Sequence, residues 1–454
     1  MEPGTHNIQI NKQLFGPDFI WGVSTSAFQV EGSSDADGKG QSIWDAFSAK
    51  KGKILNGDKP GAACNFYNQY QKDIDIIKQL GIPNFRFSIS WSRILPNGTG
   101  EINEAGIAYY NRVIDYCLQQ GIQPWVTLYH WDIPQALELK GGWTNREVVE
   151  WYTSYVIVCA KHFGDRVKHW MMMNEPTVFT AAGYFLGIHA PGRTGIRNFL
   201  PAIHYVVLSI VAGAKALRSV LPDAEIGTTF SCAHIEPRSD KKKDIDAAKR
   251  TDVLVNRLFI EPILGLGYPD KDFPVLKGIE KFYKPGDQDN MKYDFDFIGI
   301  QNYTREIVEY SFFTPYLNAR LVKAEERHVP TTAMKWEVYP AAIYQMIKKF
   351  NGYPQIKKLY ITENGAAFHD EVIDGKINDD NRIDYLQANL QQVLKAKNEG
   401  YKIGGYFIWT LTDNFEWAEG FHPRFGLVYV DFKTQQRIIK SSGYWYRDFL
   451  SVHS

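Results

Sequence analysis

The sequence predicts an α/β protein that folds as a single barrel of eight parallel strands, a (β/α)8 barrel, with long loops at the carboxyl ends of the strands. Three observations predict this fold. Short runs of apolar and β-branched residues alternate with amphipathic helical segments along the chain. Eight such runs occur, and eight parallel strands joined by helices close into a barrel. Glycine follows several of the helical segments, as it commonly does where a helix ends.

The amino-terminal half contains four of the expected strands and three of the expected helices. Apolar residues recur every three or four positions in the helical segments. The strands are expected over residues 19–24, 85–91, 125–131 and 167–175. The helices are expected over residues 67–80, 104–120 and 147–162. Residues 32–61 are rich in glycine, aspartate, lysine and serine, and they are expected to form a long excursion.

The carboxyl-terminal half continues the alternation. Its strands are expected over residues 226–230, 295–300, 359–363 and 406–411. Its helices are expected over residues 203–220, 247–259, 340–350 and 384–397. A barrel of this type needs about 250 residues, so the excess length is expected in the loops that follow the strands, where such barrels carry their active sites. No shift in composition favours dividing the chain, and residues 1–454 are expected to form one TIM barrel domain.

Composition and charge exclude several classes of protein. Hydrophobic residues make up 44% and charged residues 22%, which suits a large folded core. The chain has 51 lysines and arginines and 51 aspartates and glutamates, so its charge favours neither nucleic acid nor an anionic membrane. No run of 18 apolar residues predicts a membrane span, and residues 1–13 lack the apolar core of a signal peptide. A cytoplasmic protein with buried, reduced cysteines is therefore expected.

Polar and aromatic side chains gather where the expected strands end, and in a parallel barrel these positions meet on one face. No metal-ligand spacing and no glycine-rich phosphate loop accompanies them, so neither a metal nor a cofactor is expected. Carboxylates and amides suit vicinal hydroxyls and indole rings suit the faces of sugar rings, so a sugar ligand is expected. The residues are Gln29, Arg86, His130, Trp131, Asn174, Glu175, Tyr303, Glu363, Trp409, Glu416 and Trp417.

Two of these carboxylates each stand at the end of a buried strand, directly before residues that break it. Pro176 follows Glu175, and Asn364 and Gly365 follow Glu363. Two carboxylates that flank a glycosidic bond suffice to hydrolyse it. A separation of about 5 Å makes such an enzyme retaining, and one of about 6.5 to 9.5 Å makes it inverting. The residues by themselves leave both outcomes open.

Six motifs resemble glycoside hydrolase family 1, the β-glucosidase family. Any one of them would be weak evidence, but six in the order of the family are specific, and they span nearly the whole chain. They are F-I-W-G-V-S-T-S-A-F-Q-V-E-G at 19–32, R-F-S-I-S-W at 86–91, Y-H-W-D-I-P at 129–134, N-E-P at 174–176, I-T-E-N-G at 361–365 and D-N-F-E-W at 413–417.

The resemblance implies a retaining mechanism and a role for each residue. Glu363 would be the nucleophile, and Glu175 would be the acid that protonates the leaving oxygen and then the base that activates water. Arg86 and Tyr303 would hold Glu363 ionised, and Asn174 would bind the 2-hydroxyl of the sugar. Trp409 would stack beneath the ring, Trp131 would line the same site, and Trp336 would lie on the leaving-group side. The other hydroxyls would be bound by Gln29, His130, Glu416 and Trp417.

The chain departs from the family pattern at three positions. Met172 stands where the family usually has threonine, in a methionine run that is expected to pack inside the barrel. Gln301 replaces the asparagine of an Asn-Tyr-Tyr motif, although Tyr303 keeps its place. Lys335 stands where glycine is common, which would add a positive charge at the entrance.

The expected activity is that of a retaining exo-β-glycosidase. It would remove the terminal β-D-glucosyl residue from oligosaccharides such as cellobiose or from aryl and alkyl glucosides, with some activity on galactosides and fucosides. The expected partner is thus a small β-glycoside, without nucleic acid or membrane, and a homo-oligomer stays open. Two alternatives are a non-catalytic sugar-binding barrel and a 6-phospho-β-glycosidase, which would need cationic groups near the last strand. The carboxylate of Glu416 at that place favours a neutral sugar.

Overall fold

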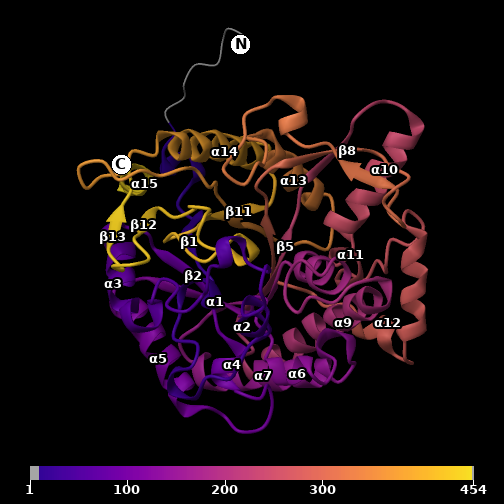
Figure 1. The fold of residues 1–454 in the computed structure, drawn as a ribbon, viewed down its shortest axis with the longest axis horizontal. Helices are drawn as coiled ribbons and strands as arrows, with labels where there is room; N and C mark the ends of the chain where they lie inside the picture. The colour runs from indigo at the N-terminus through magenta and orange to yellow at the C-terminus, as the bar shows by residue number, and fades with distance from the viewer. Residues whose placement is uncertain (1–9, 452–454) are drawn as a thin grey trace.

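The computed structural model describes residues 10–451. Within this range, eight parallel strands form a closed barrel in the middle of the molecule, and helices surround it (Figure 1). Strands that follow one another along the chain are neighbours in the barrel, and the last strand pairs with the first. The predicted (β/α)8 barrel is confirmed. Its strands are β1 Ile20–Ser24, β2 Asn84–Ser88, β3 Gln123–Tyr129, β4 His169–Asn174, β5 Glu225–Ser231, β7 Phe297–Gln301, β10 Leu359–Asn364 and β11 Ile403–Trp409.

Most of the helices that alternate with the strands lie close to the predicted ranges, and the two that begin at Ile196 and Lys242 start earlier than predicted. Gly81 and Gly121 follow two of the others with φ angles of 64° and 77°, the left-handed conformation that glycine adopts without steric cost. These helices are α3 Phe66–Gln79, α5 Glu104–Gln119, α7 Val148–Phe163, α9 Ile196–Val220, α10 Lys242–Asp252, α13 Ala341–Asn351 and α14 Asp380–Asn398.

Three predicted strands end at least two residues earlier than expected. The strand predicted over 406–411 is β11, which starts at Ile403 and ends at Trp409. The strand expected over 85–91 ends at Ser88, because Trp91 starts the short helix α4 Trp91–Ile94 and stacks on Tyr155 with ring centroids 4.9 Å apart. The strand expected over 125–131 ends at Tyr129, because Trp131 has a φ angle of 74° and turns the chain. In the last two cases the aromatic residue packs outside the strand although its β-propensity favours one.

Helix α9 begins seven residues before the predicted position, at Ile196. By length and composition it is the one helix among residues 10–451 that is apolar enough to cross a membrane, but 83% of its most apolar stretch is buried inside the protein. It is packed most extensively against α7. Its hydrophobicity is therefore that of a core helix. Helix α10 also starts earlier than predicted, and it continues into a π-helical turn, η6 Val253–Arg257.

Several short elements that the sequence did not predict lie in the long loops and at the end of the chain. A small sheet contains β6 His234–Pro237, β8 Arg305–Tyr310 and β9 Ala319–Leu321, and it comes from the loops after β5 and β7. The chain ends with the hairpin of β12 Val428–Val430 and β13 Arg437–Ile439 and with helix α15 Ser441–Ser451. The extra length of the chain thus lies largely outside the barrel strands.

One end of the barrel is filled by a layer of large side chains. Gly22 and Gly227 make room for this layer, because an added Cβ would lie 2.3 Å from the ring of Phe407 or Phe297. Met171 belongs to the layer, whereas Met172 packs in the larger core cluster, so only part of the methionine run fills the interior. The layer closes the barrel below the carboxyl ends of the strands, and it consists of Trp125, Met171, Phe297, Tyr360 and Phe407.

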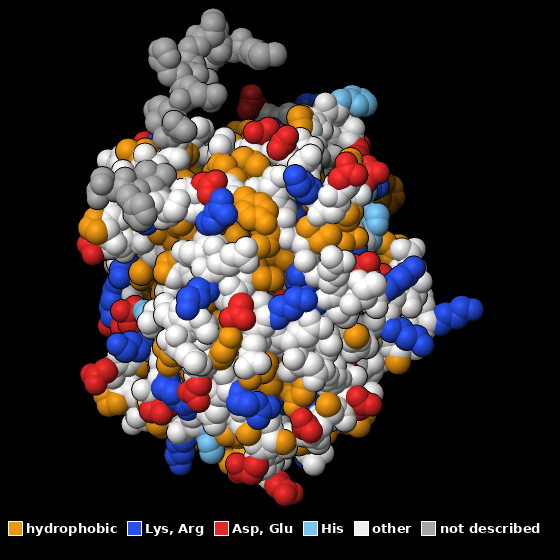
Figure 2. Space-filling model, turned by 90° about the vertical axis from the view of Figure 1, so that its left-hand side faces the viewer, with side chains coloured by type: hydrophobic (Ala, Val, Ile, Leu, Met, Phe, Trp, Pro, Cys, Tyr) orange, Lys and Arg blue, Asp and Glu red, His pale blue; other side chains and the backbone are white. Residues whose placement is uncertain are grey.

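The surface and the cysteines agree with the composition. Figure 2 shows basic and acidic side chains interspersed on one face, without a region of a single sign. The four cysteines are buried free thiols, as predicted. The prediction about the polar segment 1–13 falls mostly on residues 1–9, which lie outside the described residues.

Candidate active site

Glu363 lies near the carboxyl end of β10 and is held by two side chains from other strands. Arg86 Nη1 donates to Oε1 at 2.5 Å, and Tyr303 Oη donates to Oε2 at 2.7 Å. The carboxylate is only 3% exposed. The strand ends one residue after it, at Asn364, and Gly365 then lies against the backbone of Trp409, where an added Cβ would be 1.9 Å from the carbonyl oxygen. Glycine at this position lets the chain turn while Glu363 stays in place.

Glu175 lies one residue beyond β4, at the start of the short helix α8 Pro176–Thr180. Its φ angle is 46°, a left-handed conformation that costs a non-glycine residue about 1 kcal/mol or more. Its backbone N–H donates to the carbonyl oxygen of Thr229 at 3.0 Å, which fixes the turn to β5. The side chain is 7% exposed and lines the same cavity as Glu363.

The two carboxylates differ in pKa because their surroundings differ. Burial raises the pKa of Glu175 well above its usual range, and the charge of Glu363 raises it further. Burial also raises the pKa of Glu363, but there the charge and hydrogen bond of Arg86 and the hydrogen bond of Tyr303 oppose the rise. A single proton on the pair therefore resides on Glu175, and Glu363 carries the charge.

Asn174, next to Glu175, is held by hydrogen bonds from three strands. Its Oδ1 accepts from Arg86 Nη2 at 2.6 Å, from Gln301 Nε2 at 2.7 Å and from Thr229 Oγ1 at 3.0 Å. These donors fix the orientation of the amide, and its nitrogen faces His130 Nε2 at 3.1 Å. Gln301, which replaces the asparagine of the family pattern, thus supports Asn174. Burial lowers the pKa of His130 well below its usual range, so this ring is neutral.

The segment after β11 forms the opposite wall. Gln29 Nε2 donates to Glu416 Oε2 at 3.2 Å and to Asn414 Oδ1 at 3.1 Å. Burial is the main reason that the pKa of Glu416 is raised to about 8. Trp417 packs against Trp131 with ring centroids 4.6 Å apart, and Trp131 Nε1 donates to the carbonyl oxygen of Asn174 at 2.9 Å. This wall thus combines a carboxylate with indole rings.

The cavity between these walls has a volume of about 390 Å³. Nine of the predicted site residues line it: His130, Trp131, Glu175, Tyr303, Trp336, Glu363, Trp409, Glu416 and Trp417. The other three, Gln29, Arg86 and Asn174, are fully buried and lie behind its wall, where they hold residues that do line it. The residues that line the cavity come from segments far apart in sequence, from His130 after β3 to Phe425 near the end of the chain.

Sequence reasoning missed several cavity residues. Thr229 was missed as well: it does not line the cavity, but it donates to Asn174, and only its place on the next strand could have indicated this bond. Ser231 lines the cavity and hydrogen-bonds Glu175. Glu306 lines it from the unpredicted strand β8, and Val255 lines it from the predicted helical segment 247–259, part of which is a π-helical turn. No local signal in the sequence indicates these residues. His189 also lines the cavity, and burial lowers its pKa to about 4.

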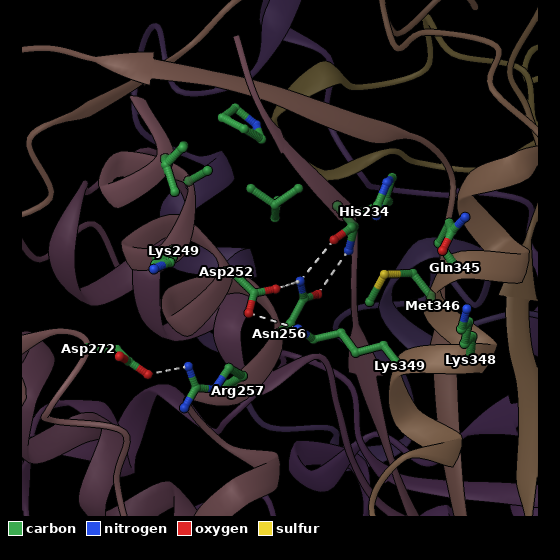
Figure 3. A pocket seen from close by; sticks show the side chains of 15 residues that line it. His234, Lys249, Asp252, Asn256, Arg257, Asp272, Gln345, Met346, Lys348 and Lys349 are labelled. Atoms are coloured by element: carbon green, nitrogen blue, oxygen red, sulfur yellow. Dashed lines mark hydrogen bonds and ion pairs between the residues drawn. The ribbon is translucent and has the colours of Figure 1, made fainter. Parts of the chain in front are cut away.

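A second cavity of about 610 Å³ lies behind the segment that carries Ser231. Figure 3 shows Asn256 in its wall. Its Nδ2 donates to the carbonyl oxygen of Ala233 at 2.9 Å, and its Oδ1 accepts from the backbone N–H of Ala233 at 3.1 Å. Asp252 accepts from Asn256 at 2.7 Å and from Lys349 at 2.8 Å. Ala233 lines both cavities, so this network supports the wall of the first one from behind.

Fold and site together define a class of protein. The cavity at the carboxyl end of the (β/α)8 barrel holds one charged and one protonated carboxylate, and indole rings and neutral polar groups surround them. This arrangement is typical of a glycosidase. The model of glycosyl hydrolase family 1 matches residues 11–454. The chain belongs to glycosyl hydrolase family 1.

Named relatives agree with this assignment. Beta-glucosidase A from Thermotoga maritima is 45% identical over 96% of this chain and 98% of that protein. The structure of a Thermotoga maritima beta-glucosidase in complex with deoxynojirimycin superimposes with a TM-score of 0.91 and 44% identity, over 96% of this chain and 98% of that one. A 6-phospho-beta-galactosidase from Clostridium acetobutylicum is 34% identical over 95% of this chain and 96% of that protein.

Proposed function

We propose that the protein is a single-domain retaining exo-β-glucosidase that removes the terminal β-D-glucosyl residue from small glycosides. The observation that carries this proposal is the asymmetry of the two carboxylates in one cavity. Glu363 is clamped by Arg86 and Tyr303 as an anion, whereas Glu175 keeps the proton. A nucleophile must be charged and a general acid must be protonated, and this pair meets both requirements.

In the first step, Glu363 attacks the anomeric carbon while the bond to the leaving oxygen breaks. Glu175 gives its proton to that oxygen, so the alcohol leaves neutral and a covalent glycosyl-enzyme remains. Arg86 and Tyr303 hold the attacking carboxylate in place. The oxygen of Asn174 already accepts from three donors, and one N–H of its amide faces His130 Nε2, so the second N–H is the group that would donate to the 2-hydroxyl.

In the second step, water hydrolyses the glycosyl-enzyme. Ester formation removes the negative charge of Glu363, and with it one of the causes that raise the pKa of Glu175. Glu175 therefore settles as a carboxylate, takes a proton from water, and the resulting hydroxide displaces Glu363. Two inversions at the anomeric carbon give net retention.

The first product of hydrolysis tests the mechanism. We expect the purified protein to hydrolyse an aryl β-glucoside and to release β-glucose before mutarotation, because a covalent intermediate inverts the anomeric carbon twice. Proton NMR of the anomeric signals during the first minutes measures this. The α-anomer as first product would contradict the mechanism, and the absence of turnover on aryl glucoside, galactoside, fucoside, mannoside and cellobiose would favour a non-catalytic sugar-binding barrel.

A 6-phosphoglycoside is disfavoured as substrate by the charge of the cavity. Among the described residues, no lysine or arginine lines it, and five glutamates do: Glu175, Glu306, Glu363, Glu416 and Glu419. We expect the kcat/KM for an aryl 6-phospho-β-glucoside to be at least about 100-fold below that for the unphosphorylated glucoside, because the phosphate would face like charge without a cation. Parallel chromogenic assays measure the ratio. Comparable values would assign the protein to the phosphoglycosidase alternative.

A further inference from the structure

Glu306 is a carboxylate in the cavity that the proposed mechanism does not use. It lies on β8 and is only partly exposed. Within residues 10–451 its carboxylate has no hydrogen-bond or ion-pair partner. By contrast, Glu309 on the same strand forms ion pairs with Arg238 and Arg320 and does not line the cavity. Glu306 is therefore the carboxylate of β8 that is available to a ligand.

The position of Glu306 places it beyond the general acid. Ser231 hydrogen-bonds Glu175, and the chain continues from Ser231 along the cavity wall into β6. Ile235 of β6 is paired with Glu306 of β8. Four residues of extended chain cover about 13 Å at most. Because Glu175 protonates the leaving oxygen, the wall that runs outward from Ser231 borders the leaving group, and Glu306 lies on that wall.

The rest of this end of the cavity is mainly apolar. Burial raises the pKa of Glu306 to about 7, and Arg327 and Glu337 act on it in opposite directions. A half-buried carboxylate without a partner costs free energy that a hydroxyl donor from a ligand would offset. The apolar side chains that line the same cavity suit the face of a ring, and none of them carries a strong hydrogen-bond acceptor. They are Val255, Leu321, Met334, Trp336 and Phe425.

We infer that Glu306 accepts hydrogen bonds from hydroxyl groups of the leaving group, and that it selects carbohydrate leaving groups over aryl ones. The inference rests on the proposed hydrolysis, because it assigns a role to the cavity end that the leaving group occupies. An aryl ring gains only the apolar contacts, whereas a sugar gains these contacts and the bond to a carboxylate. Hydrogen bonds to charged groups are the stronger ones, so the selection is expected to be large enough to measure.

The test compares leaving groups in Glu306→Ala and Glu306→Gln, with Glu309→Ala as a matched carboxylate control on the same strand. The substrates are cellobiose, cellotriose and 4-nitrophenyl β-glucoside, and the quantity is kcat/KM. In Glu306→Ala we expect a fall of about 10-fold or more for at least one oligosaccharide, with the aryl glucoside within about twofold of wild type. Glu306→Gln should lose less, because the amide still accepts a hydrogen bond. Glu309→Ala should leave the ratio unchanged.

An unchanged ratio of oligosaccharide to aryl kcat/KM in Glu306→Ala would overturn the inference. An equal loss on all three substrates would overturn it too, because it would indicate a structural role. Hydrolysis of the aryl glucoside alone by the wild-type protein would show that the site does not accept carbohydrate leaving groups. If the wild type hydrolyses none of the three substrates, the proposed function fails and the inference with it.

Discussion

The Glu363→Ala variant is expected to lose at least about 10⁴-fold in kcat/KM on aryl β-glucosides and to gain the ability to couple α-glucosyl fluoride to a sugar acceptor. The substitution removes the nucleophile and leaves a gap beside the anomeric carbon. An α-fluoride fits that gap and has the configuration of the covalent intermediate. Glu175 then takes the proton of the acceptor hydroxyl, the new β-glycosidic bond forms, and fluoride leaves.

Two measurements check this result. ¹⁹F NMR follows the release of fluoride, which should depend on the acceptor, and mass spectrometry with proton NMR identifies the β-linked product. Glu309→Ala is the control for folding and assay, and it should hydrolyse the aryl glucoside like the wild type, because Glu309 does not line the cavity. A folded Glu363→Ala protein that still hydrolyses glucosides well, or that couples no fluoride, would contradict the assignment of the nucleophile.

The Glu175→Gln variant should separate substrates by the basicity of their leaving groups. For cellobiose, whose leaving oxygen needs a proton, we expect kcat/KM to fall by about 10³ to 10⁴-fold. For 2,4-dinitrophenyl β-glucoside, whose phenolate leaves without a proton, the first step should stay within about 10-fold of wild type. Turnover should then stall, because no base activates water. Added azide should restore turnover and give β-glucosyl azide, since azide needs no base.

The pH dependence of the same variant provides an independent reading. In the wild type, kcat/KM should fall at high pH as Glu175 loses its proton, and the raised pKa of Glu175 places this limb above the usual range of a glutamate. It should fall at low pH as Glu363 gains a proton. With 4-nitrophenyl β-glucoside, whose leaving group is more basic and gains from the proton, Glu175→Gln should keep the acid limb and lose the alkaline limb. An unchanged alkaline limb would assign that limb to another group.

Much of the fold and the two central carboxylates could be predicted because their signals are local. The alternation of strand and helix periods is visible in short windows, and the residues that end a strand lie next to the carboxylate that they position. Pro176 directly follows Glu175, and Asn364 and Gly365 follow Glu363. The order of motifs along the chain then identified the family. The predicted strand ends were less accurate, because Trp91 and Trp131 favour a strand by their β-propensity but pack outside the strands.

The remaining features depend on contacts between residues that lie far apart along the chain. Arg86 and Glu363 are 277 residues apart, and Gln29 and Glu416 are 387 residues apart. The pairing of β6 with β8, which places Glu306 at the leaving-group end, has no counterpart in local propensity. By itself, the sequence determined a (β/α)8 barrel with two carboxylates at its carboxyl end, since hydrophobic periodicity and turn residues act locally. The tertiary structure decided which carboxylate keeps the proton and which carboxylate is left for the leaving group, because burial and partner charges arise only when distant segments meet.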